Sequence, residues 1–386
     1  MRWCAACRQV VDLRLQSVKR LIALKSSTKL PVYQTTKLMK LPLMTLAGVC
    51  ILSTLPVSAA LNIDFNFDAS VNMDAQAAAI RAASVWENAL NDSVTVTVDF
   101  GFSSLGATTL GSTSAVQLAA GFDTIRNRMV IDNAFESAPD AIVNYLPTAA
   151  TASFSALTNY GGNPISYGLS GNISASKANL KSIGFTGLDT QFGASDGAFN
   201  FSTDFNFDFD NSDGVATGSY DFESVVLHEI AHLLGFISVV DQIDARLAAG
   251  ETSILGISPT ALDLFRFDSE NLPTNDAEFT AFARDLSTED SASLSNVSIA
   301  YAMETGVQTG SGQQASHFKD NSDLGTLDPT LAPGEIAALS TADLLALDLI
   351  GWDVDSLLLP VPEPSAYGVI AASLAFLCVI LRRPCR

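Results

Sequence analysis

The residues of this sequence whose types and spacing could do chemistry lie between positions 221 and 236. His228 and His232 are four residues apart, so on a helix their imidazoles leave one face about one turn apart. Two neutral imidazoles in that arrangement can bind one Zn²⁺ ion, and the carboxylate of Glu229 can reach a water molecule beside it. On a helix, the pattern His-Glu-x-x-His therefore predicts hydrolysis assisted by a metal ion.

The local sequence favours a helix over 222–234. Asp221 is a natural N-cap and Gly235 a natural C-terminal stop. Between them, apolar residues occur on most sides of the helix, so we expect it to be buried: Phe222, Val225, Val226, Leu227, Ile230, Leu233 and Leu234. The alternative is a core helix whose histidines only form hydrogen bonds, but burying Glu229 and both imidazoles without a metal is unfavourable unless each group is paired.

A catalytic zinc ion has three protein ligands and an open position, so a third ligand must come from elsewhere in the chain. His317, the one other histidine, is the first candidate, because neutral imidazole is a natural zinc ligand. Asp241 and Glu251 are the alternatives. The spacing from His232 to Glu251 is similar to that of the gluzincins, although Gly250 beside it makes a poor helix interior.

The segment HEIAHLLGF, a long insertion and then Ser-His-Phe around His317 resemble the leishmanolysin-like metallopeptidases, which are metzincins with a displaced third histidine. The usual metzincin pattern places that histidine where this chain has Ser238. The resemblance implies a zinc site of His228, His232 and His317, with Glu229 as the general base. It also implies a metzincin-like mixed sheet, an active-site helix and a C-terminal subdomain.

The same resemblance places Leu327 where the family has the methionine of its Met-turn, and leucine can provide a similar apolar floor. The implied function is that of a secreted zinc-dependent endopeptidase, which hydrolyses a polypeptide substrate by a metal-activated water. The alternative from another class is a catalytically inactive surface or matrix protein, or a calcium-binding interaction protein, that keeps the fold.

The composition is that of a folded, acidic protein. Of the 386 residues, 48% are hydrophobic and 16% are charged, which excludes disorder as the dominant state. The net charge of −20 argues against nucleic acid as a partner, because phosphate groups need a basic surface. Most acidic residues lie in 61–360, the expected metallopeptidase domain, whereas all five cysteines lie outside it. Asp208, Asp210 and Asp213 make Ca²⁺ a second candidate ligand, although they miss the EF-hand spacing.

The first 60 residues are predicted to be a targeting segment. Lysines precede an apolar run over 41–60 that ends in small residues, as in a secretory signal peptide. Met39, just before Lys40, is the start that such a signal favours, so 1–38 are expected to be an upstream misassigned start. The alternative is a long basic region before the apolar run.

The last 26 residues, 361–386, contain Pro-Glu-Pro, an apolar run over 366–381 and a cluster of arginines. This order resembles the PEP-CTERM sorting signal of Gram-negative bacteria, which implies a sorting membrane enzyme that cleaves near the Pro-Glu-Pro. We therefore expect an exported protein at the cell surface or outside a Gram-negative cell, transiently anchored by a short transmembrane helix. The alternative is a permanent anchor.

The region between the two ends predicts an α/β (α+β) fold with a mixed sheet, because a helix and a strand follow an opening strand. Apolar and polar residues alternate at 61–68 and 93–102, whereas 74–90 has helical spacing. A weaker strand is expected at 126–132, and loops and short strands over 146–200. The segment DFNFD, which occurs at 64–68 and 204–208, predicts an amphipathic strand at each place. An apolar helix should run from a capping box at 340–343 to a stop at Gly351.

Overall fold

The computed structural model describes residues 60–136, 139–148, 153–160, 163–251, 257–286, 292–296, 299–308, 310–355 and 358. The predicted sorting signal and, apart from residue 60, the predicted signal peptide lie outside the described residues. The five cysteines lie outside them too.

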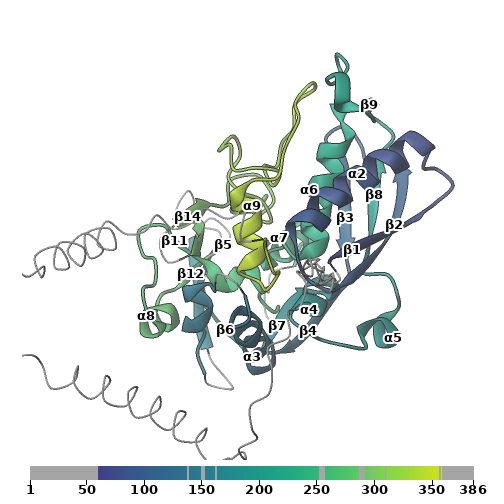
Figure 1. The fold of residues 1–386 in the computed structure, drawn as a ribbon. Helices are drawn as coiled ribbons and strands as arrows, with labels where there is room; N and C mark the ends of the chain where they lie inside the picture. Colours follow the sequence, from purple (N-terminus) through teal and green to yellow (C-terminus); the bar gives the residue numbers. More distant parts are fainter. Residues whose placement is uncertain are drawn as a thin grey trace, which may run out of the picture. The chain divides into compact units, whose positions relative to one another are not determined.

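The sheet beside the candidate site has four strands in the order β1-β2-β8-β3 (Figure 1). Its strands are β1 (Asn62–Phe67), β2 (Thr95–Ser103), β8 (Gly197–Ser202) and β3 (Gly111–Ala115). The first three are parallel, whereas β3 pairs antiparallel with β8 and forms an edge of the sheet. Val96, Val98 and Phe100 alternate along β2 and are buried, which fixes the face of the strand that meets the core.

Helices α2 (Met73–Ala89) and α6 (Phe222–Leu234) pack against each other and against this sheet (Figure 1). The buried side of α2 is mostly alanine: Ala75, Ala78, Ala79, Ala82, Ala83 and Ala89. Such small side chains allow the two helices to approach closely. The indole N–H of Trp86 donates to the carbonyl oxygen of Leu227 at 3.1 Å, so α2 also ties down the middle of α6.

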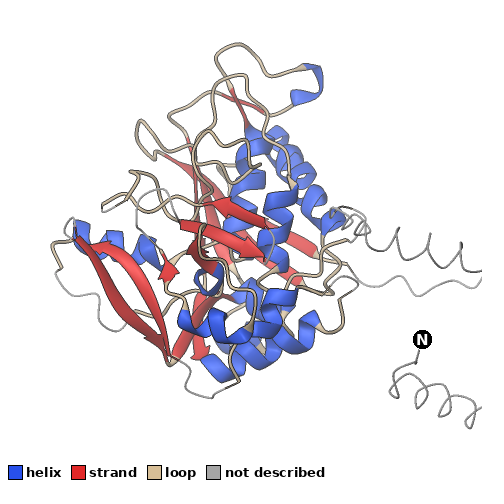
Figure 2. Cartoon of the chain, turned by 90° about the vertical axis from the view of Figure 1, so that its left-hand side faces the viewer, coloured by secondary structure: helices blue, strands red, loops and turns tan. Residues whose placement is uncertain are grey.

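A second sheet has six strands in the order β14-β13-β11-β12-β5-β6. Figure 2 draws the strands of both sheets in red. Its strands are β5 (Ser153–Tyr160), β6 (Asn163–Ser170), β11 (Arg266–Asp268), β12 (Arg284–Asp285), β13 (Ala292–Asn296) and β14 (Ile299–Ala302). Only β12 and β5 pair in parallel among them. The region after α6 therefore shares its sheet with an earlier part of the chain, and C-terminal residues alone do not build this layer.

The other elements are short. The helices are α3 (Phe122–Asn133), α4 (Lys177–Ser182), α5 (Leu188–Phe192), α7 (Val239–Ala248), α8 (Asp276–Ala281) and α9 (Thr341–Asp348), and three 3₁₀ turns cover Ala141–Tyr145, Asn211–Asp213 and Leu262–Phe265. Two further sheets have two strands each: β4 (Gln117–Gly121) with β7 (Asn172–Ser176), and β9 (Phe207–Asp208) with β10 (Tyr220–Asp221).

The predicted fold class is confirmed, because helices and mixed sheets alternate along the chain. The helices predicted at 74–90 and 222–234, and the strands at 61–68 and 93–102, are present within a residue or two. The capping box of α9 forms between Ser340 and Asp343. The helix ends at Asp348, and Gly351, just after it, has a left-handed φ of +94°.

The strand predicted at 126–132 is wrong, because these residues belong to helix α3. The buried residues of α3 are Phe122, Ile125, Met129 and Asn133, which recur at intervals of three or four and form one helical face. The segment 126–132 omits the first two of these buried residues, and what remains is only a short alternation of polar and apolar residues. The helical period is therefore visible only over the full length of α3.

The prediction of loops and short strands over 146–200 is only partly right. This stretch contains two eight-residue strands, β5 and β6, and the short helices α4 and α5. The two copies of DFNFD also differ: the first lies in β1, whereas the second contributes only the two residues of β9. The alternating pattern of 204–208 therefore does not by itself produce a full strand.

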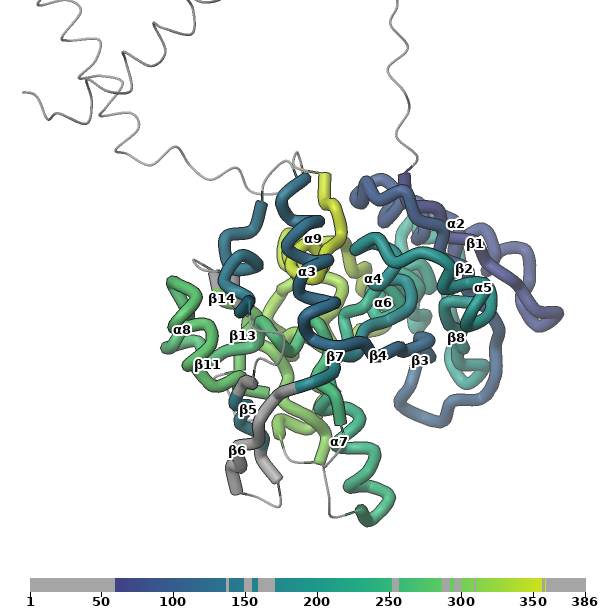
Figure 3. Tube along the Cα trace, turned by 90° about the horizontal axis from the view of Figure 1, so that it is seen from below, coloured from purple at the N-terminus to yellow at the C-terminus, as the bar shows by residue number. Residues whose placement is uncertain are grey.

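Several carboxyl groups gather where the end of α3 lies near α9 (Figure 3). One oxygen each of Asp132, Glu136 and Asp353 lies within 4.8 Å of the others. Burial, followed by the charge of Asp353, raises the pKa of Asp132 to about 7. The same two causes raise the pKa of Asp92 to about 8. Burial, followed by the charge of Asp348, raises the pKa of Glu136 to about 9.

These raised pKa values predict that the protein becomes less stable as the pH rises. The unfolded chain loses these protons near pH 4, whereas the folded chain keeps them up to about pH 7 to 9. The folded state therefore binds more protons across this window, so the stability that the cluster contributes is fully present below about pH 4, falls as the pH rises, and is lost by about pH 7 to 9. Urea denaturation of the full chain between pH 5 and 9 should show this fall.

Asp92→Asn tests the source of the effect, because asparagine keeps the oxygen that accepts the N–H of Asp353. We expect it to reduce the loss of stability between pH 5 and pH 9 by about 4 kcal/mol, because a folded-state pKa of about 8 lies about three units above pH 5. The exposed Asp99→Asn is the control and should leave the slope unchanged. Equal slopes for the wild type and Asp92→Asn would contradict this account.

Candidate metal centre

Helix α6 begins and ends where the sequence predicts. The side chain of Asp221 accepts the backbone N–H of Ser224 at 3.0 Å, and Gly235 ends the helix with φ at +123°. A Cβ at Gly235 would lie 3.0 Å from Cδ1 of Ile350, so the conformation and the available space both require glycine.

After α6, the chain bends by 98° into α7. Within the described residues, no single helix is long and apolar enough to cross a membrane, although α6 and α7 together meet those criteria across their bend.

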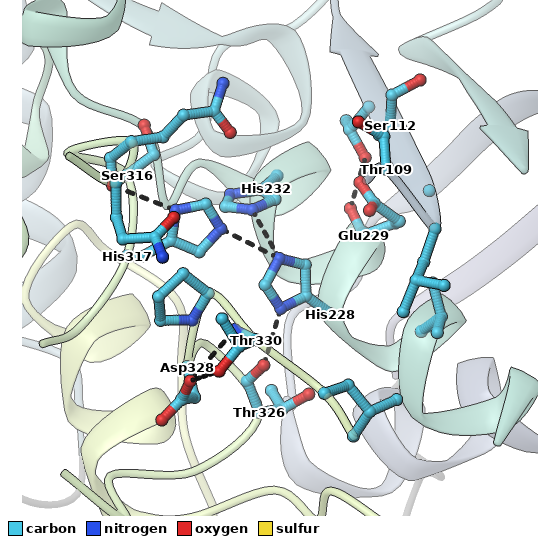
Figure 4. Close-up of a pocket in the computed structure, with 18 of the residues that line it drawn as sticks. Thr109, Ser112, His228, Glu229, His232, Ser316, His317, Thr326, Asp328 and Thr330 are labelled. Atoms are coloured by element: carbon cyan, nitrogen blue, oxygen red, sulfur yellow. Dashed lines mark hydrogen bonds between the residues drawn. The ribbon is translucent and has the colours of Figure 1, made fainter. Parts of the chain in front are cut away.

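The three histidines of the chain meet at one point, as Figure 4 shows. The Nε2 atom of His228 lies 3.0 Å from Nε2 of His232 and 3.1 Å from Nε2 of His317. His228 and His317 are 89 positions apart in the sequence. The fold therefore brings together the ligand set that the resemblance implies.

Each imidazole is held through its other ring nitrogen by a backbone carbonyl oxygen. Nδ1 of His228 lies 2.7 Å from the oxygen of Thr326, and Nδ1 of His232 lies 2.8 Å from that of Phe236. Nδ1 of His317 lies 3.0 Å from the oxygen of Gln314. A carbonyl oxygen can only accept a hydrogen bond, so each Nδ1 carries the proton and each Nε2 presents a lone pair.

Burial keeps the imidazoles of His232 and His317 neutral. It is the largest cause that lowers the pKa of His232 to about 3, followed by the charge of His228. Burial also lowers the pKa of His317 well below its usual value, with His232 and His228 acting in the same direction. Neutral imidazole is the form that binds metal ions, so the site needs no proton release from these two residues at neutral pH.

The chemistry of this donor set fits a zinc ion. Ligands at about 2.0–2.1 Å from a tetrahedral zinc ion lie about 3.3 Å from one another, close to the separations seen here. Three converging lone pairs repel unless a cation lies between them, and three imidazoles leave a fourth position open. The histidines line a cleft of about 1060 Å³, so a substrate can reach that position.

Glu229 is buried beside the histidines and faces the edge strand β3 (Figure 4). The hydroxyl of Thr113 on β3 donates to Oε2 of Glu229 at 2.6 Å. Burial raises the pKa of Glu229, whereas the charge of His228 and the hydrogen bond from Thr113 lower it. The carboxylate is therefore oriented and shielded from solvent, as a general base must be.

Gly111, two residues before Thr113 on β3, leaves the space that this carboxylate needs. A Cβ at Gly111 would lie 2.8 Å from Oε1 of Glu229 and 3.0 Å from Cγ1 of Val225. The sequence analysis missed Gly111 and Thr113. No local signal could reveal them, because their contact with α6 depends on the pairing of β3 with β8.

The rival third ligands, Asp241 and Glu251, do not reach the histidines. The carboxylate of Asp241 accepts the N–H of Ala315 at 2.8 Å and the hydroxyl of Ser316. Glu251 lies more than half exposed, with Oε2 3.9 Å from Nε of Arg246. Among the three candidates, His317 alone joins the pair on α6.

The loop that corresponds to the expected Met-turn lies directly beside the site. Leu327 is fully buried, and its carbonyl oxygen accepts the N–H of Phe318, the residue after His317, at 3.0 Å. The preceding residue, Thr326, supplies the carbonyl for His228. Asp343 of α9 accepts the N–H groups of both Thr326 and Leu327, which fixes this loop to the core.

The acidic residues considered for calcium stabilise turns. Asp208 accepts the N–H of Asp210 at 3.0 Å and that of Ala216 at 2.7 Å, and Asp210 accepts the N–H of Ser212. In the part of the chain that the structure describes, the groups of three or more candidate metal ligands are the histidines and the Asp132–Glu136–Asp353 cluster, and Asp208 is in neither. Calcium binding stays a prediction.

Comparisons of this chain with protein-family models, with curated proteins and with solved structures found no match. The assignments to the leishmanolysin-like family and to the sorting signal therefore stay predictions. The function has to be argued from the chemistry of the site, since a shared fold would not fix it in any event.

The third ligand can be tested by removing it. His317→Ala should weaken zinc binding by more than about 100-fold, because losing a ligand costs more than the 10- to 100-fold typical for a residue that only supports one. Competition with a chromophoric chelator, using the full chain, measures the change. Glu251→Ala is the control and should bind zinc as the wild type does. Full zinc affinity in His317→Ala would exclude this ligand set.

Proposed function

We propose that this protein is a zinc-dependent endopeptidase. The observation that carries the proposal is the convergence of three histidine Nε2 atoms in a cleft that also contains Glu229. An ion bound by three imidazoles and open to a cleft, with a carboxylate beside it, is the arrangement used for hydrolysis by an activated water. The resemblance of residues 221–236 to leishmanolysin-like metallopeptidases supports a peptide as the substrate.

The protein side chains divide the work in the following way. A zinc ion held by His228, His232 and His317 would supply a Lewis acid that polarises the scissile carbonyl and lowers the pKa of water to about 7. Glu229 accepts a proton as the water attacks the carbonyl carbon, and then donates it to the leaving amine. Thr113 and Gly111 hold the carboxylate in position for both transfers. The backbone carbonyls that accept the Nδ1–H groups of His228, His232 and His317 orient the three rings, so that their Nε2 atoms face the position where the ion would bind.

The edge strand β3 offers a way to bind an extended polypeptide. Residues 107–113, which include part of β3, line the cleft together with residues 325, 326 and 328–331. Among the described strands, β3 pairs only with β8, so its other edge can form backbone hydrogen bonds with a peptide. A substrate bound in this way recognises the protein mainly through its backbone, which favours unfolded segments.

The decisive test is Glu229→Gln in the full chain. This change removes the base and no metal ligand, so we expect unchanged zinc content and a loss of casein cleavage by about 100- to 10,000-fold. Zinc content and the release of casein peptides should be measured on the same samples. Glu223→Gln is a matched control on the same helix, because Glu223 pairs with Arg81 at 2.8 Å and does not line the cleft.

The three candidate functions give different outcomes in this experiment. A peptidase loses activity in Glu229→Gln alone, whereas an inactive surface protein with the same fold binds zinc and cleaves nothing in any variant. A calcium-binding interaction protein binds Ca²⁺ and no zinc. Cleavage of casein by Glu229→Gln at the wild-type rate would refute the proposed base.

The proposal includes export and removal of the C-terminal segment, which rests on the sequence of residues 361–386. A sorting enzyme that cuts near Pro362-Glu363-Pro364 would release the chain from the membrane. We expect the intact mass of the protein recovered outside the cells to lack residues 366–386. A mass that includes them would instead indicate a permanent anchor.

A further inference from the structure

The segment that carries His317 is fixed by a carboxylate on another element. Asp241 lies in the first turn of α7, and its Oδ1 atom accepts the N–H of Ala315 at 2.8 Å. Its Oδ2 atom accepts the hydroxyl of Ser316. Both oxygens are therefore bound to the two residues that directly precede His317, across 74 and 75 positions of the sequence.

The contact with Ala315 reaches the imidazole through a single peptide group. The N–H of Ala315 and the carbonyl of Gln314 belong to the same planar peptide and, in the trans form, point in opposite directions. Asp241 holds the N–H side of this group, whereas the carbonyl side lies 3.0 Å from Nδ1 of His317. The chain of contacts thus runs from carboxylate to peptide to imidazole.

Two further contacts hold the residues that directly follow this peptide group. The carbonyl oxygen of Ala315 accepts a hydrogen bond from the buried guanidinium of Arg266 at 2.8 Å. The hydroxyl of Ser316 accepts the N–H of Ser238 at 2.8 Å. Ser238 occupies the position at which the usual motif has its third histidine, so this residue contacts the segment that supplies the ligand in its place.

We propose that Asp241 is a positioning residue that sets the zinc affinity of the site by orienting His317 through the Gln314–Ala315 peptide. This inference rests on the proposed zinc site. A negative charge on the N–H side polarises the peptide and makes its carbonyl a better acceptor for Nδ1–H. That hydrogen bond fixes the tautomer and the ring orientation, which are the roles that a supporting carboxylate usually has when it contacts a metal-bound histidine directly.

The position of Asp241 explains why α7 serves this purpose. α7 follows the 98° bend after α6, so one continuous stretch of chain carries two of the ligands and the group that orients the third. The geometry of a metal site must be held to about 0.5 Å, which a segment 89 positions away cannot ensure without such a link. Asp241 provides it with one side chain.

The test measures zinc affinity in the full chain by competition with a chromophoric chelator, together with the absorption spectrum of the Co²⁺ form. Asp241→Ala should weaken zinc binding on the order of 10- to 100-fold and change the Co²⁺ spectrum. Asp241→Asn keeps an oxygen for the Ala315 N–H and should recover most of the affinity. Ser316→Ala removes the contact with Oδ2 of Asp241 and the acceptor of the Ser238 N–H, but it keeps the link from Asp241 to the Ala315 N–H, so it should have a smaller effect than Asp241→Ala.

A double-mutant cycle separates positioning from general damage to the fold. If Asp241 acts through His317, adding Asp241→Ala to His317→Ala should cause no further loss of affinity. Asp244→Ala is the matched control: Asp244 lies one turn later on α7 and accepts the N–H of Val307, so it contacts the same connecting segment away from His317. It should leave the affinity within about twofold of the wild type.

Each result has a distinct meaning. Zinc affinity within twofold of the wild type in Asp241→Ala, or an equal loss in both backgrounds of the cycle, overturns the positioning role while leaving the proposed function intact. A wild-type protein that binds no zinc overturns the proposed function itself. Recovery in Asp241→Asn together with a null effect in the His317→Ala background supports the inference.

Discussion

Three hydrogen bonds from imidazole N–H groups to backbone carbonyls are the interactions on which the rest of this site depends. A neutral imidazole has one proton, and committing it to Thr326, Phe236 or Gln314 leaves the lone pair on the opposite nitrogen. Because the three lone pairs point to one place, they repel one another in the absence of a cation. This repulsion would destabilise the folded protein, and the three histidines line a cleft. A purely structural role therefore does not explain the arrangement well.

The three carbonyls come from parts of the chain that the fold must place independently. Phe236 follows α6 directly, so its carbonyl is positioned by the turn at Gly235. Thr326 is held by Asp343 at the start of α9, and Gln314 belongs to the segment that Asp241 and Arg266 bind. The buried helix α6 therefore acts as the common reference, because the alanine face of α2 and Trp352, whose indole donates to Leu234, fix it on different sides.

The sequence was sufficient for the elements whose signals are local. The helix at 222–234 has its cap, its apolar residues and its stop within 16 residues, and the capping box of α9 is equally compact. His317 could be selected because the chain has one other histidine and a resemblance to follow, but nothing local predicts its contact with α6. The contacts of Thr113 and of Asp241 could not be predicted, because they depend on strand register and on the bend between α6 and α7. The strand expected at 126–132 failed for a related reason, since its helical period extends beyond the window.

An ion held by His228 and His317 would also act as a cross-link across 89 positions of the chain. The described residues contain no cysteine, so no disulfide restrains this long excursion from within. In the loop-entropy view, a bond of that span removes freedom from the unfolded state worth on the order of 4 kcal/mol. Stripping the ion would then shorten the time for which the chain survives as a folded molecule, in addition to stopping its chemistry. The lifetime of the folded protein would then depend on the concentration of zinc around it.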